Sequence, residues 1–391
     1  MEFEEPDAEV SGSKGAHLNM LIAAGANIAS THELFRRITG ETARALRGAR
    51  YALVVDEETE WSREYEMRPD DIRGMFAAEY VYRDDKDRVR WNYEKWPTYN
   101  GNKYAEVKEL ADKGALVFVN DELMIWEMPR EFLELFEEVY VLTYLFEGSV
   151  LSAYMRANDI PYMVKTLDAD SNLVDIDGGN ERRVKAELRE LVTVVDSPKL
   201  NAVGRRHNAL SKSWYSNDMK VGGRKVKELQ ANTYDFFTNY VDSPGRENLW
   251  SCFKTYDGKS ALSDHLKGKR YTRQWTPVNL RGTNKYMHCR SLAYLANIYI
   301  RPRLRQYFRD CGYEPNDDLY ALSQLVQWVW RSRIRQHRLP DGERTISLYL
   351  PSARMRRLFL NWLHDRALDT ELDPVTGKAL ELKHGTGTAR E

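Results

Sequence analysis

The sequence has few cysteines and no long apolar run. Its three cysteines are widely spaced and odd in number, which argues against a disulfide framework or a zinc site and fits a reducing compartment. No apolar run approaches the roughly 20 residues that a membrane span needs. The N-terminal stretch is acidic and lacks the apolar core of a signal peptide. We therefore expect a cytoplasmic protein with no membrane partner.

The sequence also lacks a Walker A phosphate loop. That motif, G-x-x-x-x-G-K-[ST], needs a preceding strand and a hydroxyl side chain after its lysine. Residues 12–15, Gly-Ser-Lys-Gly, meet neither condition, because no strand precedes them and Gly15 follows the lysine. We interpret residues 1–15 as a loop and not as a nucleotide site.

What the chain does contain suits a globular protein of two domains. Its 391 residues are 42% hydrophobic and 30% charged, with a net charge of −1. The charge is uneven, because residues 1–150 hold 18 Lys and Arg against 31 Asp and Glu, whereas the remainder holds 40 against 28. A basic second half favours a polyanion partner bound mainly there, although two differently charged surfaces without a ligand explain these numbers equally well.

The most informative stretch of the sequence is an apolar run that ends in carboxylates. Residues 51–55, YALVV, show no polar alternation and predict a strand buried on both faces. Ligands of open α/β folds bind beyond the carboxyl ends of strands, where Asp56 and Glu57 follow. In a Walker B reading, Asp56 holds Mg²⁺ and Glu57 orients or deprotonates the attacking water. The alternative is a strand followed by an acidic, solvated turn.

Two further strands lead into groups that could bind or couple. Residues 26–30 predict a strand, and Thr31 predicts the N-cap of a helix whose N-terminus could bind a phosphate. Residues 139–142 predict a second buried strand that ends in a turn containing Thr143 and Gly148. A plain capped helix and an ordinary strand–turn–helix are the respective alternatives.

The remaining elements follow from periodicity. Residues 116–119 and 123–126 predict a hairpin, 191–195 and 345–350 predict strands, 289–300 predict a helix, and 61–113 predict surface helices and loops.

The second half carries two basic motifs. Residues 281–285, Arg-Gly-Thr-Asn-Lys, form a polar turn that could bind a phosphate. An apolar helical stripe starts at Leu319 and extends toward Arg338, with Arg331 and Arg335 four residues apart. On one helix face, two such guanidiniums could both reach one phosphate group. The alternatives are an ordinary turn and a solvated basic helix end.

Taken in order, these motifs resemble the motor core of the superfamily 2 helicases. The runs that suggest this are STHELF, YALVVDEE, LSQLVQWVWRSRIR and ISLYLPSARMR, and more closely they resemble helicase-like proteins of bacteriophages and mobile elements. The resemblance covers most of residues 17–365. The sequence departs from the family's pattern in motif VI, where Trp330 replaces a glycine and the last arginine is displaced by one residue to Arg335, and in Leu142-Thr143-Tyr144, which is diverged from motif III.

The resemblance implies a role for each matching residue. The implied catalytic residues are Asp56, also the metal ligand, with Glu57, Arg331 as the arginine finger, and Arg335; the coupling residues are Thr143, Gly148 and Gln327; and the nucleic-acid-binding residues are Thr31, His32, Arg281, Thr283, Asn284 and Lys285. The implied fold is α/β, with two RecA-like domains that carry parallel sheets, the first truncated at its N-terminus. The domains would span residues 1–154 and 155–368, followed by a flexible tail, 369–391.

The function implied is an ATP-dependent nucleic-acid helicase or translocase core, with DNA the favoured nucleic acid. The phosphate loop would supply the main ligands of the β- and γ-phosphates, so ATP and Mg²⁺ are expected only where such a loop is supplied. We expect this chain alone to hydrolyse ATP poorly or not at all. Two alternatives remain open, a non-enzymatic nucleic-acid-binding remnant and a phage DNA-packaging ATPase.

Overall fold

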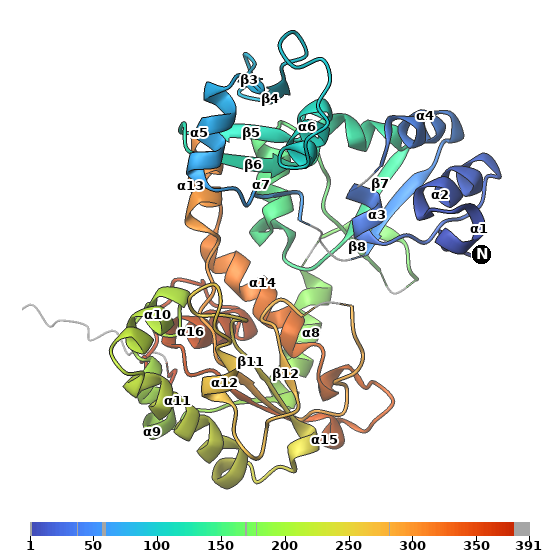
Figure 1. Cartoon of the computed structure of the whole chain (residues 1–391). Coiled ribbons are helices and arrows are strands. Elements are labelled where there is room, and N and C mark those ends of the chain that lie inside the picture. The colour runs from blue at the N-terminus through green and yellow to red at the C-terminus, as the bar shows by residue number, and fades with distance from the viewer. Residues whose placement is uncertain are drawn as a thin grey trace, which may run out of the picture. The chain divides into compact units, whose positions relative to one another are not determined.

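The computed structural model divides into two compact units, which are described separately (Figure 1). Unit 1 comprises residues 1–161 and 301–315, and unit 2 comprises residues 162–300 and 316–391. The structure describes residues 2–36, 38–56, 60–168, 170–176, 178–280 and 282–378. Glu57 and Arg281, two of the predicted site residues, lie outside these ranges.

The predicted domain boundaries differ from the structure in three places. The boundary at residues 154 and 155 falls inside α7 (Val150–Ala157), and the chain leaves unit 1 only after that helix. The predicted flexible tail begins too early, because the Asn201 amide donates to the Val375 carbonyl at 2.8 Å and Leu372 is only 5% exposed. The return of residues 301–315 to unit 1 was not predicted.

Unit 1 contains a small antiparallel sheet and a separate parallel strand pair. Its strands are β1 (Ala52–Asp56), β2 (Ser62–Glu64), β3 (Val81–Arg83), β4 (Val89–Trp91), β5 (Leu116–Val119), β6 (Leu123–Glu127) and β7 (Glu138–Leu142). Its helices are α1 (Ala8–Ser11), α2 (Lys14–Ala23), α3 (His32–Arg36), α4 (Gly40–Ala49), α5 (Pro69–Ala77), α6 (Ala105–Asp112), α7 and α13 (Pro302–Asp310), with 3₁₀ turns η1 (Arg130–Leu135) and η2 (Phe146–Gly148).

The antiparallel sheet has the strand order β2-β6-β5, and its β5–β6 hairpin confirms the predicted pairing of residues 116–126. Residues 61–113 are not the surface segment that we predicted, because Trp61 and Trp91 are 0% and 3% exposed. The many charged residues of this segment suggested a surface. Some of them pack on the core, however, and the Nζ of Lys108 lies 5.8 Å from the centre of the Trp91 ring.

The strand that ends in Asp56 pairs in parallel with β7, with Val54 opposite Tyr140 and Asp56 opposite Leu142. Val55 is 4% exposed, but Val54, Tyr140 and Leu142 on the other face are 58%, 37% and 53% exposed. The prediction that both strands are buried on both faces is therefore wrong. Apolar side chains on the exposed face removed the alternation that would have shown a half-buried strand.

Unit 2 is built on a wholly parallel sheet of five strands, in the order β10-β14-β13-β11-β12. Its strands are β8 (Lys165–Leu167), β9 (Leu173–Asp175), β10 (Val192–Val194), β11 (Asn248–Ser251), β12 (Trp275–Thr276), β13 (Ser291–Tyr294) and β14 (Ile346–Tyr349), of which β8 and β9 form a separate hairpin. Its helices are α8 (Gly179–Leu191), α9 (Pro198–Asn201), α10 (Lys212–Lys220), α11 (Arg224–Asp235), α12 (Ser263–Leu266), α14 (Asp317–Val329), α15 (Asp341–Arg344) and α16 (Ala353–Leu363), with short turns η3 (Ala202–Gly204), η4 (Phe236–Tyr240), η5 (Gly245–Glu247) and η6 (Arg333–Arg335).

Helices cover both faces of this sheet, with α9 and α11 on one side and α8 and α14 on the other (Figure 1). The ring of Tyr349 stacks on Phe236 at a centroid distance of 5.3 Å, and Tyr294, on the opposite face, packs against Trp328 at 5.1 Å. The predicted strands at 191–195 and 345–350 are confirmed. The helix predicted over 289–300 is wrong, because Ser291–Tyr294 forms the central strand β13; periodicity alone does not distinguish a short buried strand from a buried helix.

Candidate functional site

The pairing of β1 with β7 brings two of the predicted motifs to one edge of unit 1. Asp56 ends β1, and Thr143 follows Leu142, the residue opposite Asp56 in β7. Parallel strands end at the same edge, so the Asp56 carboxylate and the Thr143 hydroxyl belong to the carboxyl edge, where open α/β folds bind ligands. Asp56 is exposed, and Gly148 is buried in η2, which begins three residues after Thr143.

The described residues fit a nucleotide and its Mg²⁺ only in part. Asp56 supplies one carboxylate, and a carboxylate with substrate phosphates is a usual Mg²⁺ environment. The described residues hold no group of three or more His, Cys, Asp or Glu that could bind a metal ion, and the sequence has no phosphate loop. We therefore derive no nucleotide chemistry at this edge.

Thr31 lies where the sequence predicted it. Its hydroxyl accepts a hydrogen bond of 3.4 Å from the amide of Leu34, and His32 begins α3. The strand predicted before it is reduced to an isolated parallel bridge between Glu4 and Ile28. The predicted loop over residues 1–15 is wrong in part, because Ser13 caps α2 by accepting from the amide of Ala16 at 3.1 Å.

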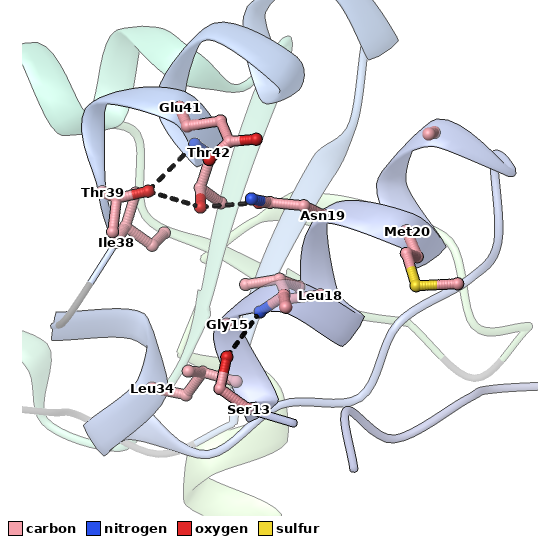
Figure 2. A pocket seen from close by; sticks show the side chains of 12 residues that line it. Ser13, Gly15, Leu18, Asn19, Met20, Leu34, Ile38, Thr39, Glu41 and Thr42 are labelled. Carbon is pink, nitrogen blue, oxygen red and sulfur yellow. Dashed lines mark hydrogen bonds between the residues drawn. The ribbon is translucent and has the colours of Figure 1, made fainter. Parts of the chain in front are cut away.

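A hollow beside these helices is lined by Ser13, Leu18, Asn19, Leu34, Thr39 and Thr42, among others (Figure 2). Two of its hydroxyl groups already bond within the protein. Thr39 caps α4, and the Thr42 hydroxyl donates to the side-chain oxygen of Asn19 at 2.7 Å. The remaining lining is largely apolar, and we assign it no chemistry.

In unit 2, the predicted arginine pair does not lie on one helix face. Helix α14 ends at Val329, and Arg333–Arg335 is a separate 3₁₀ turn, so Arg331 and Arg335 are not related by a turn of one helix. Two bonds end the helix: the Ser332 hydroxyl donates to the Val329 carbonyl at 2.7 Å, and the Arg333 amide donates to the Cys289 carbonyl at 3.0 Å. Arg331 is 8% exposed, and Gln327 is half-buried on α14.

In the second half, the segment that follows the first basic motif is in contact with the segment around the second. The Arg333 guanidinium donates to the His288 carbonyl at 3.0 Å, and the Gln336 amide donates to the Met287 carbonyl. These carbonyls follow Thr283, Asn284 and Lys285 closely in the chain and precede β13. The meeting point is therefore the amino edge of the sheet, not the carboxyl edge at which α/β folds usually bind ligands.

The carboxyl edge of this sheet is filled by the chain itself. The strand order reverses between β11, which continues to β12, and β13, which continues to β14, and a ligand crevice is expected at such a point. On the same edge, beyond the ends of β13 and β14, the buried Arg354 donates to the Asn297 side chain at 2.9 Å and pairs with Asp318 at 2.7 Å. The sequence analysis missed Arg354. Its guanidinium carbon lies 4.2 Å from the centre of the Tyr299 ring, and because Tyr299 is 55 positions away in the chain, no local pattern indicates this contact.

Unit 1 holds a second buried ionic group that the sequence did not reveal. Glu127 is 0% exposed; it lies 3.2 Å from the Arg88 guanidinium and accepts from the Ser62 hydroxyl at 3.3 Å. Burial raises the pKa of Glu127, against the opposing effects of Arg88 and of a hydrogen bond from Tyr307 in α13. Tyr307 therefore anchors the returning segment 301–315 to unit 1. The sequence did not indicate that Glu127 is buried, because this residue follows the apolar residues of β6 and resembles an exposed strand end.

Most of the chain is similar in sequence to known proteins. Residues 186–363 match a family described as the YonV C-terminal Rossmann-like domain, and residues 63–126 match the YonV middle domain. Over 355 residues the chain is 30% identical to the SPbeta prophage-derived uncharacterized protein YonV of Bacillus subtilis (strain 168), covering 89% of this chain and 82% of that protein. No solved structure matches the chain significantly. Among the described residues, no helix is both long and apolar enough to cross a bilayer.

Proposed function

Because the chain belongs to the YonV family, with its Rossmann-like C-terminal domain and a prophage-derived relative, we propose that it is a nucleic-acid-binding protein built like a superfamily 2 helicase core. In this proposal both parallel sheets are RecA-like, and the protein works on DNA in the cytoplasm. It does not complete an ATPase site from its own residues, because the sequence has no phosphate loop.

The single observation that carries the proposal is the parallel pairing of β1 with β7. Asp56 and Thr143 are 87 positions apart, yet the register brings them to one edge. The resemblance to helicases requires this arrangement of the Asp-Glu strand and the coupling strand, because a motor links its metal ligand to its coupling turn. An unrelated order of strands would have separated the two motifs.

The proposal is tested by measuring binding and turnover together. Purified chain is titrated into fluorescent DNA and RNA of about 20 nucleotides, and phosphate release from ATP is followed in the same mixtures. We expect salt-dependent binding without nucleic-acid-stimulated turnover. Absence of binding at about 50 mM salt would overturn the proposal.

A second candidate, nucleic-acid binding with no trace of a motor, is favoured by one observation. Arg331 is only 8% exposed and does not share a helix face with Arg335, so the two guanidiniums that the resemblance implies as catalytic are not presented together. Mn²⁺ binding separates the candidates. If the β1–β7 edge is that of a motor, Asp56→Asn should lose bound Mn²⁺. Asp85→Asn, which changes another exposed carboxylate of unit 1, should keep it. The second candidate predicts no difference between the two variants.

A further inference from the structure

We propose that the amino edge of the five-stranded sheet in unit 2 binds the phosphate backbone of a nucleic acid without reading its sequence. This inference rests on the proposed function for the identity of the polyanion. It adds the location of the surface and the residues that form it.

The surface is a row of arginines placed just before three neighbouring strands. Arg290 precedes β13, Arg246 precedes β11 and Arg273 precedes β12, and these strands are adjacent in that order. Neighbouring strands lie about 4.8 Å apart, so the row extends over roughly 10 Å. That length spans several backbone phosphates, since each strand of a duplex carries one charge per about 3.4 Å of axis. The side chains of Arg246 and Arg290 are 82% and 45% exposed, and Arg273 is exposed as well.

The row is joined into one surface by hydrogen bonds. The side-chain amide of Gln274 donates to the Arg246 carbonyl at 2.6 Å. The same Gln274 nitrogen lies 2.9 Å from Nε2 of His288. The Asn248 amide donates to the Arg270 carbonyl at 3.0 Å. These bonds connect the backbone segments that carry the three arginines.

The surface holds more cations than its acids neutralise. Glu247 is the carboxylate at its centre, and three guanidiniums share it: Arg290 at 2.6 Å, Arg246 at 3.8 Å and Arg333 at 3.9 Å. One negative charge thus faces three positive charges. Only Arg290 is at hydrogen-bond distance from it, so the highly exposed Arg246 keeps its donors available for a phosphate.

The contrast with the opposite edge supports this location. At the carboxyl edge, Arg354 is 2% exposed and its donors are taken up by Asn297, Asp318 and main-chain carbonyls. At the amino edge, by contrast, the Arg246 and Arg290 side chains remain 82% and 45% exposed, although Arg290 bonds to Glu247. Guanidinium groups bind phosphates bidentately, and contacts to the backbone carry no sequence information.

The test uses two triple variants of equal charge. Arg246→Gln/Arg273→Gln/Arg290→Gln alters the row, and Arg224→Gln/Lys225→Gln/Lys227→Gln alters exposed cations of α11 in the same unit. The probe is a fluorescent single strand of about 20 nucleotides, titrated at several salt concentrations. We expect the row variant to bind at least tenfold more weakly and its slope of log K against log salt to fall by about 2, and the α11 variant to keep the wild-type slope.

A variant of opposite sign and a fold check complete the experiment. Glu247→Gln removes the shared carboxylate and is expected to strengthen binding several-fold, with an unchanged unfolding midpoint in all variants. Equal effects of the two triple variants, or weaker binding by Glu247→Gln, would overturn the inference. If the wild-type chain binds and the row variant binds equally well, this surface is wrong but the proposed function stands; if the wild-type chain does not bind, the proposed function fails first.

Discussion

Buried charges decide where unit 2 can accept a ligand. Arg354 bonds to two main-chain carbonyls, those of Ile298 and Asp317, besides Asn297 and Asp318. Removing one partner of such a network leaves the others buried and unsatisfied, which costs more than the pair contributes. The residue is therefore a structural cation that closes the carboxyl edge.

Arg354→Lys should lower the free energy of unfolding by about 3 kcal/mol, because an ammonium group does not reproduce the planar fork that reaches all these acceptors. Denaturant unfolding followed by circular dichroism measures it. Arg224→Lys, on the exposed face of α11, is the control and should change the value by less than about 0.5 kcal/mol. Equal values for the two variants would show that the network is not formed.

Glu127 gives unit 1 a pH dependence of definite sign. Its folded-state pKa is raised above the ordinary value of 4.5, so its contribution to stability is fully present below that pH and is lost as the pH rises through the folded pKa. As the pH rises above 4.5, the wild-type chain should therefore lose stability relative to Glu127→Gln. Denaturant titrations at several pH values measure this difference. Glu131→Gln, an exposed control, should follow the wild type; a constant difference for Glu127→Gln would contradict the assignment.

At the scale of elements, periodicity predicted strands better than their burial. The segments around Asp56, Val192 and Ile346 are strands as predicted, because β-branched runs bounded by polar residues favour extended structure. Two elements escaped prediction because tertiary contacts define them. Residues 291–294 become a strand by insertion between β11 and β14, and α14 ends where Ser332 and the Cys289 carbonyl take its hydrogen bonds.

The one-sided burial of β1 can be tested by substituting its two valines. Val55→Ala removes apolar volume from the covered face and should cost about 1 to 2 kcal/mol, whereas Val54→Ala, on the exposed face, should cost less than about 0.5 kcal/mol. Thermal or denaturant unfolding compares the two. Equal costs would show that the outer face of the β1–β7 pair is covered in solution.

At the scale of the whole molecule, the sequence predicted the α/β class with parallel sheets and a viral relative. It could not predict the composition of the site. Residues 333 and 336 bond to residues 287 and 288 at the amino edge, a contact that the sequence did not predict, because it depends on the order and direction of the strands. The row of Arg246, Arg273 and Arg290 has no local signature either, since each arginine precedes a strand by one or two residues at unrelated positions in the chain.

The 391 residues contain no phosphate loop, and this leads to a prediction about ATP turnover. Without the loop's amides and lysine, ATP loses its main phosphate ligands, so nucleic acid should not stimulate phosphate release above the rate without protein. A coupled phosphate assay with saturating DNA measures it. Turnover that is abolished by Asp56→Asn would show that another segment of the chain supplies the cradle.

The central claim, that this chain binds nucleic acid through electrostatic contacts with the backbone, is tested most directly by the salt dependence of binding. Purified chain is titrated into a labelled DNA strand between about 50 and 200 mM salt. We predict that log K falls linearly with log salt and that strands of different sequence give the same slope. Binding that is absent at the lowest salt, or that does not change with salt, would contradict the claim.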